Sequence, residues 1–348
     1  MTAVAFLIPG DLELPTGGYH YDRRALAMLA AHGIRARHVR LPGSYPTPTA
    51  ADLAETARIV AALPPASVLL IDGLALGAMP ADLIAAFRRP LVALCHHPLC
   101  LEAGLDASRQ AELRASETAA LRLSDAVIVT SPATRGLLVR DFAVPAGRIT
   151  VAMPGTDPAP RAEGSGTPLQ LLAVGSVVPR KGYDVLVKAL ERVSEQDWRL
   201  TIAGADDRNV AAASALREQV ARSGFGPRID ITGAVSDPEL FRLYARADVF
   251  VMPSLFEGYG MVLAEAMARG LPIVCTTGGA AAETAPDDAA IKVPPGDEGA
   301  LGEALRRVIL DDALRQSMAK VSWIAGLKLP RWEDTARAIA GVIRKVAL

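Results

Sequence analysis

Two carboxylates and two glycines lie close together in the C-terminal half of the chain. Glu257 and Glu265 are separated by seven residues, and Gly258 and Gly260 form a Gly-x-Gly turn just after the first carboxylate. Glycines allow the backbone to approach a ligand closely, and ionised carboxylates accept hydrogen bonds from hydroxyl groups. This combination indicates a binding site for a ligand that carries hydroxyls.

The elements on either side place this turn at one edge of a sheet. The apolar run 248–252 predicts a strand before the turn, and Met261–Arg269 predicts a helix that a glycine and a proline then end. The start of that helix leaves the amides of Gly260, Met261 and Val262 free to bind an anion. Phosphate and hydroxyl groups together indicate a nucleotide sugar. The plain alternative is an ordinary strand–loop–helix with exposed glutamates.

The whole stretch from Glu257 to Val274 resembles the signature of a known enzyme family. It reads Glu-Gly-Tyr-Gly-Met-Val-Leu-Ala-Glu-Ala-Met-Ala-Arg-Gly-Leu-Pro-Ile-Val, similar to the Glu-x7-Glu motif of retaining glycosyltransferase family 4. The resemblance implies the GT-B fold, an α/β architecture of two doubly wound, Rossmann-like domains that face each other across a cleft. It also implies that Glu265 holds ribose hydroxyls and Glu257 sugar hydroxyls, with Gly258 and Tyr259 beside the donor. No metal ion is implied, and closure of the two domains is expected to exclude water.

A second segment, Gly175-Ser-Val-Val-Pro-Arg-Lys-Gly182, follows another predicted strand and carries two cations. A cation at the end of a strand can stabilise a diphosphate as it leaves, and Lys181 is the residue we expect to do so. The family pattern is Gly-Arg-x-x-x-x-Lys-Gly, and here Ser176 stands at the arginine position. Arg180 is the candidate to supply the missing guanidinium. The alternative for Arg180 is a solvated side chain in a basic turn.

Gly17, Gly18 and Tyr19 lie in the loop after the first predicted strand. The loop lacks the Gly-x-Gly-x-x-Gly spacing of a dinucleotide site, which argues against an NAD-dependent oxidoreductase. The resemblance implies that Gly17 and Gly18 lie against the donor, and Tyr19 is a candidate acceptor contact. A plain flexible turn is the alternative.

Two histidines, His96 and His97, follow the predicted strand Leu91–Cys95. Histidines at a strand end suit acid–base chemistry or metal binding. No third ligand lies at metal-ligand spacing in the sequence, so no metal site is expected. The resemblance implies that His96 contacts the donor sugar, while His97 is placed near the acceptor. Without the resemblance, a structural role is favoured for both.

The loop after the predicted strand Ile229–Thr232 carries the last candidate. The resemblance implies that its backbone near Val235 meets the nucleobase. Ser236 or Asp237 is expected to cap the helix that begins at Pro238.

Short apolar runs alternate with helical patterns along the whole chain, which is typical of parallel α/β units. A Pro/Gly/Ser-rich linker at Pro154–Pro168 separates two such series. We therefore expect an acceptor-binding domain over 1–160, a nucleotide-sugar-binding domain over 161–330, and a C-terminal helix over 331–348 that crosses back to the first domain. The predicted strands are Val4–Ile8, Ala36–Arg40, Val68–Asp72, Leu91–Cys95, Ala126–Thr130, Ile149–Met153, Leu169–Val174, Arg199–Ala203, Ile229–Thr232, Val249–Met252 and Ile273–Thr276.

The composition excludes several other classes of protein. The chain has 348 residues, 51% of them hydrophobic, and a formal net charge of -1, which argues against a nucleic-acid partner. Its three cysteines form neither a metal-spaced pair nor a disulfide framework, and no signal peptide or membrane span is evident, so a cytoplasmic location is expected. Weak peripheral membrane contact stays open because five arginines gather near the first predicted helix, although a solvated helix face explains them more simply: Arg23, Arg24, Arg35, Arg37 and Arg40.

The sequence therefore predicts a retaining glycosyltransferase that moves a hexose-type sugar from a nucleoside-diphosphate donor to an unknown acceptor. Two alternatives stay open. One is a hexosamine 2-epimerase on the same architecture. The other is a nucleotide-sugar-binding protein without transferase activity, because Ser176 replaces the usual arginine. The base, the sugar, the acceptor and the oligomeric state do not follow from the sequence.

Overall fold

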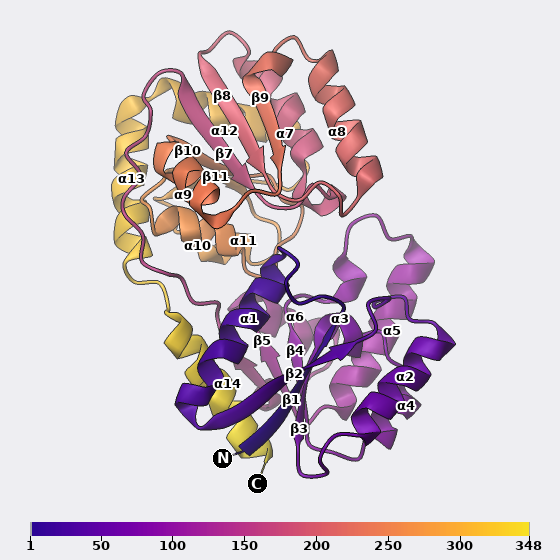
Figure 1. Cartoon of the computed structure of the whole chain (residues 1–348). Helices are drawn as coiled ribbons and strands as arrows, with labels where there is room; N and C mark the ends of the chain where they lie inside the picture. The colour runs from indigo at the N-terminus through magenta and orange to yellow at the C-terminus, as the bar shows by residue number, and fades with distance from the viewer. Residues whose placement is uncertain (1, 348) are drawn as a thin grey trace. The chain divides into compact units, whose positions relative to one another are not determined.

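The computed structural model describes residues 2–347 and divides into two compact units (Figure 1). Unit 1 contains the described residues up to Gly155 together with those from Pro330 onward, and unit 2 spans Thr156–Leu329. The C-terminal helix α14, Trp332–Val346, therefore belongs to unit 1, where it packs against α1, Gly17–Leu29.

Unit 1 is built on a parallel sheet in the order β2-β1-β3-β4-β5-β6. Its central strands are buried along their whole length, as expected when helices cover both faces of a parallel sheet. The strands are β1 Thr2–Pro9, β2 Ile34–Leu41, β3 Val68–Asp72, β4 Leu91–Cys95, β5 Ala126–Val129 and β6 Ile149–Val151. The other helices are α2 Ala50–Ala61, α3 Gly73–Leu76, α4 Ala81–Ala86, α5 Ala107–Leu123 and α6 Pro132–Asp141.

Unit 2 repeats this plan with a parallel sheet in the order β12-β11-β10-β7-β8-β9. Its strands are β7 Leu169–Val174, β8 Trp198–Ala203, β9 Ile229–Gly233, β10 Val249–Met252, β11 Ile273–Thr276 and β12 Ala290–Val293. Its helices are α7 Tyr183–Ala189, α8 Val210–Arg222, α9 Asp237–Arg246, α10 Met261–Met267, α11 Ala281–Thr284, α12 Glu298–Leu310 and α13 Asp312–Gly326.

The predicted fold class is confirmed, because each unit is a doubly wound, Rossmann-like α/β unit. Eleven of the strands that the structure shows overlap the predicted ranges. The twelfth, β12, was not predicted: it is a four-residue edge strand whose Lys292 interrupts the apolar pattern. Short edge strands carry little period-two signal.

The strand orders locate the position in each unit where a ligand site is expected. In unit 1 the chain reverses direction across the sheet between β1 and β3, and in unit 2 it does so between β7 and β10. At such switch points the loops that leave neighbouring strands diverge, and a crevice opens at the carboxyl ends of those strands. The loop after β7 carries Lys181, and the loop after β10 carries Glu257.

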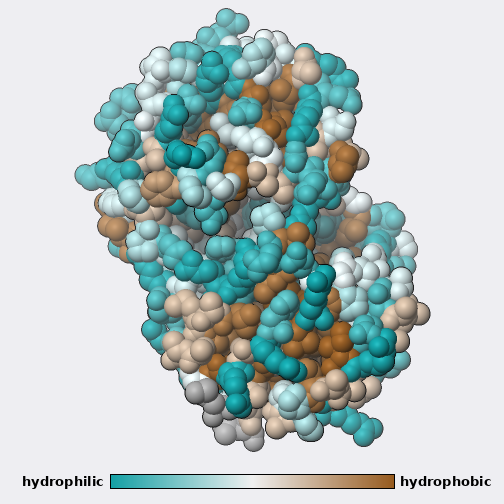
Figure 2. Space-filling view, viewed as in Figure 1, coloured by the Kyte–Doolittle hydropathy of each residue, from teal (hydrophilic) through white to brown (hydrophobic). Residues whose placement is uncertain are grey.

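The face shown in Figure 2 is mostly hydrophilic, with smaller hydrophobic areas between the polar side chains. Scattered exposed apolar side chains of this kind are normal on a globular protein. Among residues 2–347, no helix is both long and apolar enough to cross a membrane.

Candidate functional site

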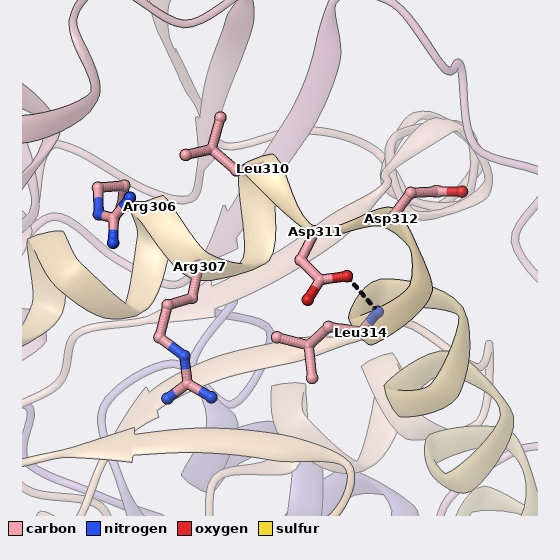
Figure 3. A pocket seen from close by; sticks show the side chains of 6 residues that line it. All are labelled: Arg306, Arg307, Leu310, Asp311, Asp312 and Leu314. Atoms are coloured by element: carbon pink, nitrogen blue, oxygen red, sulfur yellow. Dashed lines mark hydrogen bonds between the residues drawn. The ribbon is translucent and has the colours of Figure 1, made fainter.

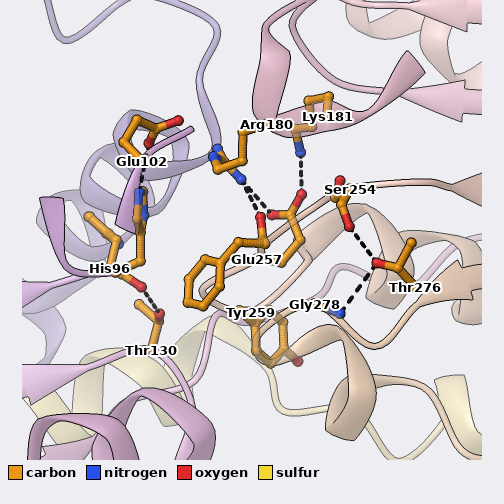
Figure 4. Close-up of polar contacts among 12 residues, drawn as sticks. His96, Glu102, Thr130, Arg180, Lys181, Ser254, Glu257, Tyr259, Thr276 and Gly278 are labelled. Carbon is orange, nitrogen blue, oxygen red and sulfur yellow. Dashed lines mark hydrogen bonds and ion pairs between the residues drawn. The ribbon is translucent and has the colours of Figure 1, made fainter. Parts of the chain in front are cut away.

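An ion pair at the switch point of unit 2 joins Lys181 to Glu257. The Nζ of Lys181 donates to Oε1 of Glu257 at 2.7 Å, and both side chains are largely buried (Figure 4). The two residues meet because β7 and β10 are neighbours in the sheet, although they are far apart in sequence. The structure therefore brings together the two residues that sequence reasoning had placed at the donor diphosphate and sugar.

Arg180 points into the same cluster. Its Nη1 donates to the backbone carbonyl of Phe256 at 2.7 Å and lies 3.4 Å from Oε2 of Glu257. Only 16% of its side chain is exposed, so the solvated alternative is wrong. Two cations thus face one carboxylate, and the cluster keeps a net positive charge that suits an anionic ligand.

Close backbone packing fixes the loops that carry these side chains. Gly182 has φ +64°, and a Cβ there would lie 2.3 Å from the carbonyl oxygen of Pro253, so only glycine allows the two loops to touch. Gly279 likewise allows a close backbone contact: it has φ +63°, and a Cβ there would lie 2.3 Å from the carbonyl oxygen of Glu257. Glu257 is held further by backbone hydrogen bonds to Gly278 and Ala280.

The cations decide the charge of Glu257. Burial alone would raise the pKa of this carboxyl, but the charges of Lys181 and Arg180 and the hydrogen bond from Lys181 outweigh burial and lower the pKa to about 2. Glu257 is therefore an anion throughout the physiological pH range, and its carboxylate can only accept hydrogen bonds.

The second carboxylate of the motif, Glu265, lies on α10 in a different setting. Its Oε2 accepts a hydrogen bond from the buried hydroxyl of Tyr244 at 2.8 Å. The guanidinium of Arg269 lies 4.3 Å from the centre of the Tyr244 ring and donates to the backbone carbonyl of Glu265. Burial raises the pKa of Glu265, while Tyr244 and Arg269 oppose the increase. The two carboxylates of the motif therefore have separate partners and different pKa shifts.

The remaining predicted residues of unit 2 lie in the turn and at the nearby helix starts. Gly260, at φ +86°, immediately precedes α10, whose first residues are Met261 and Val262, and Tyr259 is buried. Gly258 joins Glu257 to this turn. In the loop after β9, Val235 is half-buried.

Ser236 rather than Asp237 caps α9, because its side chain accepts from the amide of Glu239. Ser176, in the loop after β7, is half-buried, and its backbone carbonyl accepts from Val178.

In unit 1, His96 follows β4 and its Nε2 lies between two carboxylates. It is 3.2 Å from Oδ1 of Asp22 on α1 and 3.3 Å from Oδ2 of Asp72 at the end of β3. Both aspartates are buried. The backbone carbonyl of His96 accepts from Thr130 at the end of β5 (Figure 4). Three segments of unit 1 therefore fix the orientation of this histidine.

The glycine pair at the start of α1 has two different surroundings. A Cβ on Gly18 would lie 3.4 Å from Cδ2 of His96, so this glycine lies against the histidine ring. Gly17 is exposed, and a Cβ there would meet nothing within 4 Å. Tyr19 is buried, and its hydroxyl donates to the carbonyl of Pro9 at 2.7 Å, which ties α1 to β1.

His97 and its loop are positioned by two glutamates. The Nε2 of His97 lies 2.9 Å from Oε2 of Glu102. The buried carboxylate of Glu117 on α5 accepts from the amides of Leu99 and Cys100 at 2.6 and 3.0 Å. Burial raises the pKa of Glu117 to about 7 against the effect of these hydrogen bonds. The loop after the two histidines is therefore held from inside unit 1.

A surface pocket in unit 2 lies away from all of these residues. It is formed where α12 ends and α13 begins, and its Asp311 caps α13 by accepting from the amide of Leu314 at 2.9 Å (Figure 3). It contains none of the predicted site residues.

Sequence reasoning missed Asp22, Asp72 and Tyr244. Asp72 ends a correctly predicted strand, so its position at the carboxyl edge of the sheet could have been used. Asp22 and Tyr244 lie inside helices and carry no local signal of their own. Only the packing of α1 against the sheet of unit 1, and of α9 beside α10, reveals their partners.

Two protein-family models match the chain, one for each series of strands. Residues 8–155 match the glycosyl transferase 4-like domain, and residues 168–311 match the family described as glycosyl transferases group 1. The mannosylfructose-phosphate synthase of Agrobacterium fabrum is 27% identical over 241 residues, which are 64% of this chain and 53% of that protein. The chain spans a little over half the length of the first curated relatives it matches.

Solved structures share the fold across nearly the whole chain. The sucrose-phosphate synthase of Thermosynechococcus elongatus has a TM-score of 0.83 at 23% identity and covers 99% of both chains. Anabaena HepE, solved in complex with UDP-glucose, has a TM-score of 0.77 at 20% identity and covers 99% of this chain and 100% of its own. Both likenesses concern the fold alone.

Proposed function

We propose a function from the premise that this chain belongs to the family 4-type glycosyltransferases of the GT-B fold. It transfers a hexose-type sugar from a nucleoside-diphosphate sugar to a hydroxyl of an acceptor, with retention of the anomeric configuration. The observation that carries the proposal is the Lys181–Glu257 pair, with Arg180 beside it, at the switch point of unit 2. A net positive cluster at this position suits a diphosphate, and carboxylates beside it suit hydroxyls.

Each predicted site residue of unit 2 has a defined role in this proposal. Lys181 and Arg180 hold the diphosphate and stabilise its charge as it leaves. Glu257, anionic because its pKa is lowered to about 2, accepts hydrogen bonds from the sugar hydroxyls. Glu265, oriented by Tyr244, accepts hydrogen bonds from the ribose hydroxyls. The turn at 258–262 and the loop near Val235 lie beside the donor.

In unit 1, His96 steadies the transferred sugar, and Gly18 allows helix α1 to lie close to the imidazole because it carries no side chain. The reaction breaks the bond between the anomeric carbon and the leaving phosphate oxygen. The acceptor oxygen then bonds to the same face of the anomeric carbon, and the leaving phosphate takes up the acceptor proton. The proposal requires no metal ion, and the complexes of Anabaena HepE with UDP and UDP-glucose support a nucleotide-sugar donor.

The donor is tested by a panel of nucleoside diphosphates in thermal-shift assays, followed by measurement of diphosphate release from the matching nucleotide sugars. We expect one base to stabilise the protein, release to continue in EDTA, and the anomeric configuration of the product to match the donor by proton NMR. Binding without release, even with a broad set of acceptors, would favour the nucleotide-sugar-binding alternative. Inversion of the product would contradict retention, and loss of release in EDTA would contradict a metal-free reaction.

A further inference from the structure

We propose that Asp22 is a positioning residue for His96: it holds the Nε2 edge of the imidazole inside unit 1 and thereby presents Nδ1 as a charged hydrogen-bond donor to an oxygen of the bound sugar. This inference deepens the proposed function and rests on it. The contact between His96 and the sugar belongs to that proposal. The assignment of Asp22, and of the protonation state that it imposes, is the new step.

The polar side chains around Asp22 are those of His96 and Asp72. Its side chain is fully buried, Oδ1 lies 3.2 Å from Nε2 of His96, and Oδ2 has no hydrogen-bond partner. Asp72 differs, because its Oδ1 also caps α3 by accepting from the amide of Leu74 at 2.7 Å. A buried carboxylate with an unpaired oxygen is costly to stability. Asp22 is therefore better explained by its effect on His96 than by a contribution to folding.

The contacts fix which edge of the ring is turned inward. Nε2 faces both carboxylates, and a Cβ on Gly18 would lie 3.4 Å from Cδ2, so Nδ1 is on the opposite side of the ring. Among residues 2–347, no hydrogen bond to Nδ1 is formed, and Nδ1 is not one of the buried polar atoms without a partner. One fifth of the His96 side chain is exposed. Nδ1 is thus the nitrogen that a ligand can reach.

The charges of the ring and of the two carboxylates depend on one another. Burial and the neighbouring Asp72 raise the pKa of Asp22 to about 7, and the charge of His96 opposes this rise. Two buried carboxylates around a neutral imidazole would leave two negative charges with one N–H between them. A second proton on the ring, at Nδ1, converts the imidazole to a cation and offsets one of these charges. Burial works against the charged ring, but Asp22 and Asp72 outweigh it and raise the pKa of His96 well above its usual range.

The other titratable groups near the ring do not supply a competing charge. Tyr21 on α1 packs edge-on against His96, with ring centres 5.2 Å apart, and burial keeps its hydroxyl neutral by raising its pKa. Cys95, the last residue of β4, is likewise kept neutral because burial raises the pKa of its thiol. The aspartates are therefore the groups that set the charge of His96.

The test compares Asp22→Asn with His96→Ala, the double variant, and Asp82→Asn as a control at an exposed acid of unit 1. The asparagine keeps the shape of the side chain and removes its charge. We expect the His96 titration midpoint, followed by NMR in the ligand-free protein, to fall in Asp22→Asn and to stay unchanged in Asp82→Asn. We expect kcat/KM to fall about 10- to 100-fold near pH 8 and less near pH 6, where an ordinary imidazole is again protonated.

The double variant separates positioning from general damage to the fold. If Asp22 acts through His96, Asp22→Asn adds no further loss to His96→Ala. An unchanged His96 titration, or losses that simply multiply, would overturn the proposal and make Asp22 a core residue. A midpoint that moves when wild-type protein is treated with EDTA would also overturn it, because a bound cation would then set the charge. The titration needs no substrate, so failure of the transferase assignment would leave its result readable.

Discussion

Nζ of Lys181 lies 2.7 Å from Oε1 of Glu257, across 76 residues of sequence. The carboxylate that would bind the sugar therefore orients the cation that would face a leaving diphosphate. Such preorganisation is effective because the charges need not rearrange during the reaction. Arg180 adds a second cation, which leaves the cluster net positive while Glu257 is satisfied.

Removing the lysine should therefore affect turnover more than binding. In Lys181→Ala we expect kcat to fall about 100- to 1000-fold, because a charge that stabilises the leaving group is lost. Steady-state release of the nucleoside diphosphate measures the effect. Lys188→Ala on the neighbouring helix is the matched control, since this lysine is 54% exposed and pairs with Glu298 at the surface. Equal turnover in Lys181→Ala and wild type would remove Lys181 from the proposed mechanism.

Arg180 should supply the guanidinium contact to the diphosphate that Ser176 cannot make. In Arg180→Ala we expect donor affinity to fall about tenfold or more, because hydrogen bonds from a charged donor contribute roughly 1.5–3 kcal/mol. Adding Ser176→Arg to this variant should restore part of the affinity, since it returns a guanidinium to the position that the family motif uses. Calorimetric titration with the matching nucleoside diphosphate gives both values. If Arg180→Ala binds as tightly as wild type, the arginine serves only the loop at Phe256.

Replacing the second carboxylate of the motif, Glu265, should affect donor binding rather than turnover. Glu265→Gln should weaken binding of the nucleoside diphosphate and change kcat little at saturating donor, because the ribose contact is made in both the ground state and the transition state. Tyr244→Phe should weaken binding less, since it removes the hydrogen bond that orients Glu265 but keeps the carboxylate. Calorimetry on both variants tests the order. Equal affinity in Glu265→Gln and wild type would refute the ribose assignment.

Much of unit 2 could be predicted because its chemistry is local in sequence. Glu257, Glu265 and the turn between them lie in one short stretch, and Lys181 ends a strand–loop segment with its own pattern. The parallel-sheet rule then places both loops at one edge. What the sequence could not decide was the orientation of Arg180, because that depends on the carbonyl of Phe256 and on the charge of Glu257.

Unit 1 was harder to predict because its polar cluster is assembled from three distant segments. His96 was identified from its place at a strand end, but the two aspartates around it come from α1 and from β3. No spacing in the sequence links them, and one of them lies inside a helix. Tyr19 shows the same limit: its hydroxyl is taken by Pro9, a contact that only the packing of α1 on β1 reveals.

The buried Glu117 predicts how the stability of the protein depends on pH. Its pKa is raised to about 7, chiefly by burial, whereas an unfolded glutamate releases its proton near pH 4.3. Between these values the folded state binds more protons than the unfolded state, so stability falls as the pH rises through this range, by at most about 4 kcal/mol. Glu117→Gln cannot ionise, and it should therefore gain stability relative to wild type between about pH 5 and about pH 8.

Urea titrations at both pH values measure this gain, and Glu112→Gln, on the exposed side of α5, is the control that should show none. If wild type and Glu117→Gln keep the same difference in stability at both pH values, Glu117 ionises normally and holds the loop at Leu99 without any cost of burial.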